Sequence, residues 1–436
     1  MTAEIALMNK EAIALAADSA VTFSVGREDR KIFPSANKIF TLSKYQPVGI
    51  MIYGSSMFME TPWETVIKVY RRVLGQKTFN TVEEYASDFL GFLSGNSDLF
   101  PESQQERYVE VSVWGYFYLI AGDINEELDQ VRRKKGQISE NEIKRTTSRH
   151  IKKHYDEWEK TPLIPSVTKR DVAALITKYR GIIDKVKKDI FQNITKTASQ
   201  QLTKIAGNLL MKFLASVLSP QLSGIVIAGF GVKDIFPALQ SFSVEGIANG
   251  ILKHKENSSL RITTQTPAVI VPFAQKEMVV AFMEGVEPNY RQVMDGYLSR
   301  LFEQYPEELV DSIEVIDDAK KENLKKKLKK ISKGILKKYQ QALENYRSEN
   351  YINPVITVVG SLPKDELAEM AESLVNLTKF KRKVSMQEET VGGPIDVAVI
   401  SKGDGFIWIK RKHYFEAGLN PQFFSNYYRR EEDGQE

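Results

Sequence analysis

The chain has 436 residues, of which 42% are hydrophobic and 27% charged, and its formal net charge is +4. This composition is typical of a globular protein with one large or two ordinary domains, and the small net charge does not favour a nucleic-acid partner. Because the chain has no cysteine, disulfides, cysteine nucleophiles and thiolate metal sites are excluded.

Strands are predicted from the first residues onward. Ile5 and Leu7 lie at alternating positions, a turn follows at Asn9, and a small apolar run leads to Asp18, which is typical of a β-hairpin. A polar loop, SVGREDRK, is expected next, then a second hairpin formed by ANKIFTL and VGIMIYG. Two helices should follow, and RYVEVSVWGYFYLIAG, residues 107–122, is predicted to be a further strand.

The rest of the chain alternates between helical and strand-like segments. Residues 123–220 are charged with helical periodicity, GIVIAGFG has the pattern of a buried strand, and residues 290–350 are again helical. KDELAEMAESLVNLTKF predicts a helix, and GGPIDVAVI with FIWIK predicts a closing hairpin. We therefore expect one α+β domain made of residues 1–122, 221–289 and 351–415, with helical insertions at 123–220 and 290–350 and a tail at 416–436.

The second helical insertion contains a lysine-rich amphipathic segment. Its apolar residues fall on one helical stripe, with lysines on the other face: Leu324, Leu328, Ile331, Ile335, Tyr339 and Leu343. One interpretation is a basic helix that binds a partner or an acidic membrane. We favour an amphipathic helix that packs on the domain with a solvated lysine face, because neighbouring carboxylates offset the charge.

Neither a metal, a cofactor nor a membrane is expected. His150 and His154 have i, i+4 spacing in a basic stretch, but without an HExxH-type glutamate they predict a solvated helix face. The most apolar helical run, LLMKFLASVL, is short and contains a lysine. The start of the chain has no signal-peptide pattern, so a cytoplasmic location is expected.

The first residues also suggest a nucleophile. Removal of Met1 would give Thr2 a free α-amine, whose near-neutral pKa allows it to act as the base for the threonine hydroxyl. Such a nucleophile needs a cation beside it and a carboxylate to orient that cation. Asp18 ends the second strand level with the start of the first, and Lys38 stands at the head of the third.

These residues resemble the proteasome β subunits and, more broadly, the N-terminal-nucleophile hydrolases. In that family an LAAD strand carries an acid sixteen residues after the catalytic threonine, and ALAAD here places Asp18 at that distance from Thr2. NKIFTL and VGIMIYG resemble the hairpin that begins at the catalytic lysine and ends at the oxyanion-hole glycine. The resemblance covers about the first 120 residues, a piece around IAGFG and residues near 360–410, in the same order.

The resemblance implies a four-layer αββα sandwich of two stacked antiparallel sheets. It also implies a cytoplasmic threonine-type peptidase or amide hydrolase that acts on peptide or protein substrates and forms a homo-oligomer. Thr2, Asp18 and Lys38 would be catalytic, and Gly54 and Thr22 would belong to the oxyanion and substrate-binding part. The helical insertions could dock a partner protein.

The chain departs from the family pattern in several places. Lys31, in RKIF, competes with Lys38 for the lysine role, and we prefer Lys38 because its strand is a hairpin-sized gap from the Gly54 strand. Phe230 replaces a serine expected near the threonine amine, and Glu388 and Val391 replace an aspartate and a serine. Two alternatives stay open: a non-catalytic proteasome-like scaffold, and a small-molecule amidase of the same superfamily.

Overall fold

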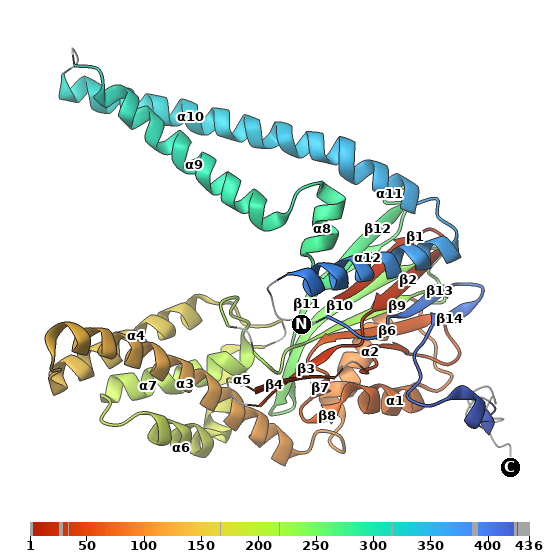
Figure 1. Ribbon diagram of the computed structural model, residues 1–436. Coiled ribbons are helices and arrows are strands. Elements are labelled where there is room, and N and C mark those ends of the chain that lie inside the picture. Colours follow the sequence, from red (N-terminus) through yellow and green to blue (C-terminus); the bar gives the residue numbers. More distant parts are fainter. Residues whose placement is uncertain are drawn as a thin grey trace. The chain divides into compact units, whose positions relative to one another are not determined.

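The computed structural model describes residues 3–25, 29–33, 35–165, 167–217, 219–314, 317–385, 391–422 and 425 (Figure 1). The chain forms two compact units. One is made of the segment up to Ile39 together with the chain from Ile262 onward, and the other is continuous from Phe40 to Arg261. Each unit has its own five-stranded antiparallel sheet and its own helices, so the protein has an α+β organisation.

The sheet of the discontinuous unit has the strand order β12-β1-β2-β13-β14. Its strands are β1 (Ala3–Asn9), β2 (Ala12–Ala17), β12 (Ala268–Ala274), β13 (Asp396–Ser401) and β14 (Gly405–Lys410). The expected hairpins β1–β2 and β13–β14 are confirmed, and β2 pairs directly with β13. The two ends of the chain sequence therefore meet in the middle of one sheet.

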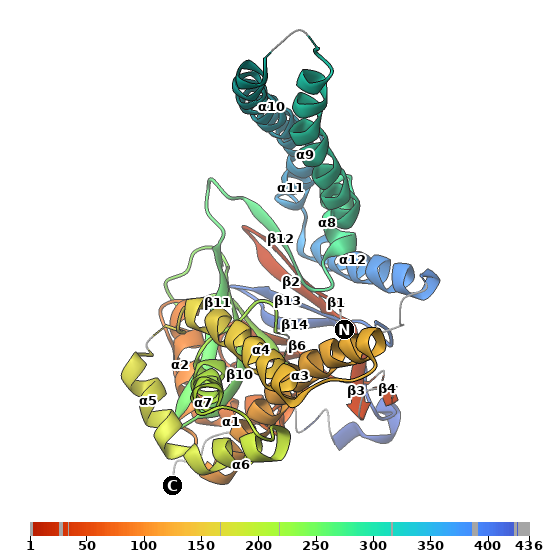
Figure 2. The same ribbon diagram turned by 90° about the vertical axis from the view of Figure 1, so that its left-hand side faces the viewer.

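Helix α12 (Lys364–Val384) lies along this sheet (Figure 2) and confirms the helix expected there. Alanines of β1 and β2 form a cluster with Leu367, Ala371 and Leu374 of α12. Small alanine side chains let the helix approach the strands closely. Asn9 fixes the turn between β1 and β2, because its Oδ1 accepts from the backbone N–H groups of Glu11 and Ala12 at 2.9 and 3.1 Å. Its Nδ2 donates to the carbonyls of Val359 and Leu362 at 3.1 and 2.8 Å.

The same unit contains a second hairpin and a group of helices. Strands β3 (Val21–Val25) and β4 (Asp29–Phe33) pair antiparallel. The expected polar loop is therefore wrong for residues 24–25 and 29–31, which lie in these strands, and residues 26–28 are outside the described part; alternating Val21, Phe23 and Val25 favour a strand. The helices are α8 (Glu277–Glu284), α9 (Pro288–Asp311), α10 (Asp318–Arg347), a π-helical turn (Ser348–Ile352), α11 (Asn353–Val359) and a 3₁₀ turn (Ala417–Leu419).

The continuous unit has a sheet of order β11-β10-β9-β6-β5. Its strands are β5 (Ile39–Thr41, which starts at the unit boundary), β6 (Val48–Gly54), β9 (Ser223–Gly229), β10 (Ala238–Ala248) and β11 (Ile251–Arg261), with a short ribbon of β7 (Met57–Phe58) and β8 (Thr61–Pro62). The helices are α1 (Trp63–Leu74), α2 (Val82–Gly95), α3 (Glu102–Lys135), α4 (Glu140–Lys160), α5 (Lys169–Lys178), α6 (Arg180–Ile190) and α7 (Lys196–Met211).

The strand predicted for residues 107–122 is wrong, because these residues lie inside α3. Their valines and aromatic residues have high strand propensity, but the buried positions Val109, Val113, Tyr116 and Ile120 recur at helical spacing. The helical segment that was expected to start at residue 123 therefore already starts at Glu102. Among the described residues, no helix combines the length and the apolar character needed to cross a membrane.

Candidate active site

The ends of β1 and β2 bring Asp18 to the first described residue of the chain. The backbone N–H of Ala3 donates to Asp18 Oδ1 at 3.1 Å, and the backbone N–H of Asp18 donates to the carbonyl of Ala3 at 3.1 Å. Every residue of β1 and β2 is buried. Both the backbone and the side chain of Asp18 therefore hold the residue that directly follows Thr2.

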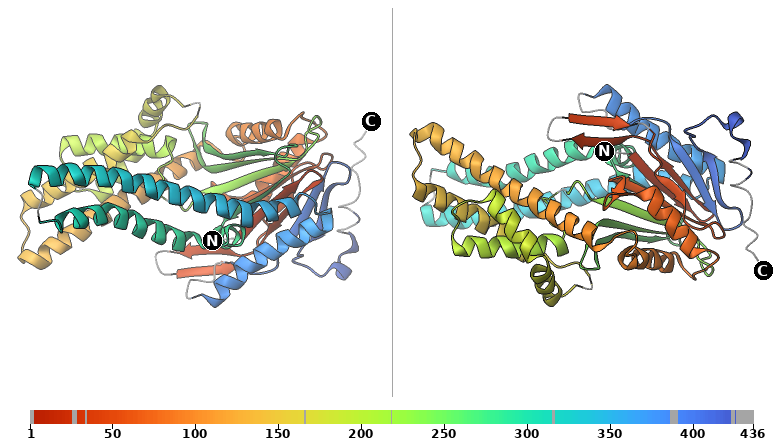
Figure 3. Two further views of the ribbon diagram at one scale, coloured as in Figure 1. Left: turned by 90° about the horizontal axis from the view of Figure 1, so that it is seen from above. Right: turned by 90° about the horizontal axis from the view of Figure 1, so that it is seen from below.

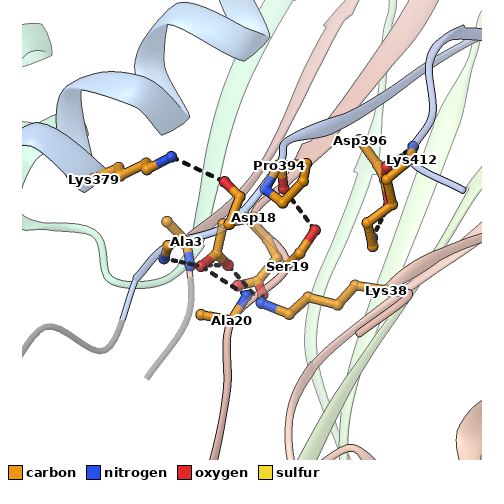
Figure 4. A network of polar contacts seen from close by, with 12 residues as sticks. Ala3, Asp18, Ser19, Ala20, Lys38, Lys379, Pro394, Asp396 and Lys412 are labelled. Carbon is orange, nitrogen blue, oxygen red and sulfur yellow. Dashed lines mark hydrogen bonds and ion pairs between the residues drawn. The ribbon is translucent and has the colours of Figure 1, made fainter. Parts of the chain in front are cut away.

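The Asp18 carboxylate is fully buried and surrounded by donors (Figure 4). Oδ1 accepts from Ala3, while Oδ2 accepts from the backbone N–H groups of Ala20 and Gly392 at 3.3 and 2.9 Å. The ammonium of Lys38 also donates to Oδ1, at 2.5 Å. Backbone donors and an ammonium together stabilise the negative charge and fix the orientation of the carboxylate.

Lys38 lies immediately before β5, and only 6% of its side chain is exposed. Its Nζ is also 3.1 Å from Oε1 of Glu4, whose side chain is fully buried. One ammonium is therefore held between two buried carboxylates. Sequence reasoning missed Glu4, and its only signal was a charged residue within an otherwise apolar strand.

The loop before β13 closes around Asp18. The N–H of Ser19 donates to the carbonyl of Gly392 at 3.1 Å, and Ser19 Oγ donates to the carbonyl of Pro394 at 2.6 Å. Lys379 of α12 donates to the carbonyl of Gly393 at 2.9 Å. The glycine pair is thus held from both sides. Val391, which precedes it, is buried, and Glu388 lies outside the described residues.

A second charged pair lies in the same network. Asp396 accepts from the backbone N–H of Lys412 at 2.8 Å and forms an ion pair with the Lys412 ammonium. Burial lowers the pKa of Lys412 below its ordinary value, although the hydrogen bond to Asp396 opposes this shift. The charge of Lys38 adds to the lowering of this pKa.

Of the predicted site residues, the structure brings together Asp18 and Lys38. Thr2 lies outside the described residues. The backbone of Thr22 lies in β3 opposite Ile32, and that of Lys31 lies in β4, but their side chains are outside the described part. Lys38 is thus the competing lysine for which the structure shows a contact with Asp18.

Gly54 and Phe230 belong to the continuous unit. Gly54 ends β6 with φ of +82°, and a Cβ atom there would lie 2.6 Å from the carbonyl oxygen of Leu222. Glycine is therefore required by the backbone itself. Phe230 follows β9; its side chain is buried and its N–H donates to the carbonyl of Pro47 at 2.9 Å.

The expectation of a solvated face for the histidine pair is wrong for His154. Its ring is buried, and its Nδ1 lies 3.0 Å from the Tyr116 hydroxyl while Nε2 lies 3.1 Å from Asp123. Burial lowers the pKa of His154, with Asp123 opposing the shift. In the described part of the chain, no group of three or more histidine or acidic side chains is placed to hold a metal ion.

Sequence comparisons add no relative: neither a family model nor a curated protein matches this chain.

Proposed function

We propose that this chain is an N-terminal-nucleophile hydrolase, a proteasome-like threonine peptidase or amide hydrolase that uses Thr2 after removal of Met1. The observation that carries the proposal is the double hydrogen bond between Ala3 and Asp18, with Lys38 on the same carboxylate oxygen. Covalent geometry keeps the Cα of the preceding residue about 3.8 Å from that of Ala3. A nucleophile at position 2 would therefore be the neighbour in sequence of the residue that Asp18 holds.

The proposed reaction divides the work between Thr2 and this pair. The α-amine of Thr2 takes the hydroxyl proton, directly or through a water molecule, while the ammonium of Lys38 favours the developing alkoxide. Oγ attacks the carbonyl carbon of the amide, and the protonated amine gives its proton to the leaving nitrogen. Water then hydrolyses the ester, which releases the acid and restores the hydroxyl.

Asp18 has a positioning role in this proposal. Its carboxylate is fixed by three backbone N–H groups, so it holds the Lys38 ammonium in place without needing to move. The oxyanion role of the Gly54 N–H, the role of Thr22 and the four-layer αββα arrangement remain parts of the proposal that rest on the family resemblance.

The first test is the mass of the intact purified protein, followed by treatment with a peptide-like electrophile that acylates N-terminal threonines. We expect a mass without Met1 and a single adduct on Thr2. Thr2→Ala should remove the adduct, and Thr2→Ser should keep it. Retention of Met1, or a processed and folded protein that is not labelled and hydrolyses no amide, would favour the scaffold interpretation. Labelling by small acyl groups but not by peptides would favour the amidase.

A further inference from the structure

Helices α9 and α10 form an antiparallel hairpin, visible side by side in Figures 1 and 3. Two ion pairs near their connection set its register. Asp311 lies 2.7 Å from Lys325, and Glu307 pairs with Lys329 one turn further along. Continuing this register residue by residue along the two antiparallel helices places Tyr305 level with Ile331 and Leu301 level with Ile335.

The two helices bury few side chains against each other. On α9, Pro306 and Val310 are buried and Phe302 is half-buried. On α10, Leu328 and Leu336 are only half-buried, and no residue in that fully described helix is buried. The expectation that the lysine-rich segment packs its apolar stripe on the domain is therefore wrong. A helix of this kind gains most of its stability from tertiary packing, which is scarce here.

The exposed apolar side chains gather on one face of the hairpin. We call the buried and half-buried positions between the two helices the contact seam: Phe302, Pro306 and Val310 on α9, and Leu328, Ser332 and Leu336 on α10. Each exposed apolar residue lies one residue before a position of this seam: Leu301 (44% exposed), Tyr305 (57%), Leu309 (41%), Ile331 (57%) and Ile335 (50%). One residue back corresponds to a rotation of about 100° around a helix. Because the helices are right-handed and antiparallel, this rotation turns both rows toward the same side, which we call the apolar face.

The opposite side of the hairpin is charged. The positions one residue after the seam carry an acidic row on α9 and a lysine row on α10: Glu303, Glu307, Asp311, Lys329, Lys333 and Lys337. The hairpin is therefore a two-helix layer with one apolar and one charged face. Such a layer is half of a four-helix bundle.

We propose that the apolar face is covered by the same face of a second copy of this chain, so that two hairpins form a four-helix bundle. Charge selects how they pair. The outer edge of the apolar face carries Lys326 and Lys330 on α10 and both Arg300 and Glu308 on α9. Stacking α10 on the α10 of a second copy would bring these lysines together. Stacking α10 on α9 instead places Glu308 level with Lys326 and Lys330, while Arg300 lies more than one turn beyond them.

This pairing fixes which residues meet. When α9 of each copy packs on α10 of the other, the two-fold axis runs parallel to the helices. Residues that are level with each other within one hairpin are then also level between the two copies. Leu301 then packs on Ile335 of the partner subunit, and Tyr305 packs on Ile331 of the partner subunit. The alternative stacking of α9 on α9 would instead bring Leu301 near the α9 row of the other copy.

The first experiment measures the oligomeric state of the full chain by sedimentation and light scattering. Leu301→Glu buries a carboxylate in the proposed bundle and should weaken self-association by about tenfold or more. Ser299→Glu is the matched control, because it adds the same charge two residues away on the charged side of α9. A chain that is monomeric throughout, or one that associates equally well with Leu301→Glu, would overturn the proposal.

The second experiment uses the absence of native cysteine. A mixture of full-length Leu301→Cys and Ile335→Cys proteins should form a disulfide-linked dimer on mild oxidation, and each protein alone should form much less. Cross-linking of Leu301→Cys only with itself, or no cross-linking, contradicts the pairing. A monomer that sediments with phosphatidylserine vesicles, and loses this binding in Leu301→Glu, would assign the face to a membrane surface instead.

Discussion

Lys38 and Asp18 form a buried ion pair in which Nζ and Oδ1 are 2.5 Å apart. The two residues stand at the ends of different strand segments, Asp18 directly after β2 and Lys38 directly before β5. Backbone N–H groups also hold the Asp18 carboxylate in place. Asp18 therefore positions Lys38, rather than the reverse. Glu4 adds a second carboxylate to the same ammonium.

Lys38→Ala should abolish acylation of Thr2 and lower the free energy of unfolding by about 3–5 kcal/mol, because two buried carboxylates lose their cation. Lys31→Ala should leave both quantities nearly unchanged. The measurements are the rate of adduct formation and a urea titration, with circular dichroism confirming that the labelled variants are folded. Loss of labelling in Lys31→Ala, with normal labelling in Lys38→Ala, would move the role to Lys31.

The two carboxylates on Lys38 should differ in their contribution to stability. Asp18→Asn removes the closest charge and replaces one of the two oxygens that accept backbone N–H groups with an NH2 donor, so it should cost about 3–5 kcal/mol. Glu4→Gln leaves the Asp18–Lys38 pair in place and should cost about 1–2 kcal/mol. Urea titrations of both variants give the comparison. Equal losses would mean that Glu4 holds Lys38 as firmly as Asp18 does.

Asp396→Asn should destabilise the protein by about 3–5 kcal/mol at neutral pH, since it leaves the buried Lys412 ammonium without its carboxylate. The pKa of Lys412 is already lowered in the folded protein, so the unfolded chain binds the proton more readily. The free energy of unfolding should therefore rise as pH increases toward the ordinary lysine pKa of about 10.4, and more steeply in the variant. The destabilisation caused by Asp396→Asn should therefore be smaller in alkaline buffer than at neutral pH. The double variant Asp396→Asn/Lys412→Met should recover stability at neutral pH; failure to do so would show that Asp396 acts through its bond to the backbone.

His154 should make the protein less stable in mild acid. Burial lowers its pKa in the folded state, so the unfolded chain binds the proton more readily. Stability should fall as pH decreases below the ordinary histidine pKa of about 6.5. His154→Gln cannot titrate, and its unfolding free energy should depend less on pH over this range. If the unfolding free energies of the two proteins changed with pH in parallel, His154 would not be the cause of the acid sensitivity, because the carboxylates titrate in both proteins.

The local parts of the site could be predicted from the sequence. Alternation and the turn at Asn9 define the first hairpin, and a hairpin necessarily brings its two ends together, so Asp18 had to lie near the start of β1. The region of α3 could not be assigned in this way. Its β-branched and aromatic residues fit a strand locally, and the helix is stabilised by packing on β10, which the local sequence does not contain.

Contacts between distant segments were beyond sequence reasoning. Gly392 reaches Asp18 only because β13 pairs with β2. Glu4 is one residue among alternating positions of β1, and its contact with Lys38 depends on where the chain returns after β4. The apolar stripe of α10 was predicted to pack on the domain, because amphipathicity indicates that a face needs cover but not what covers it.

The pairing of β1 with β12 and of β2 with β13 has a consequence for the order of events during synthesis. The continuous unit, Phe40 to Arg261, can fold while translation proceeds, since its segments emerge one after another. The β1–β2 hairpin is made first but has both edges unpaired until Ala268–Ala274 and then Asp396–Ser401 leave the ribosome. A lone two-stranded hairpin is at best marginally stable. A nascent chain would thus carry Thr2 throughout its synthesis, yet would lack the Gly392 donor to Asp18 until nearly all of the protein had been made.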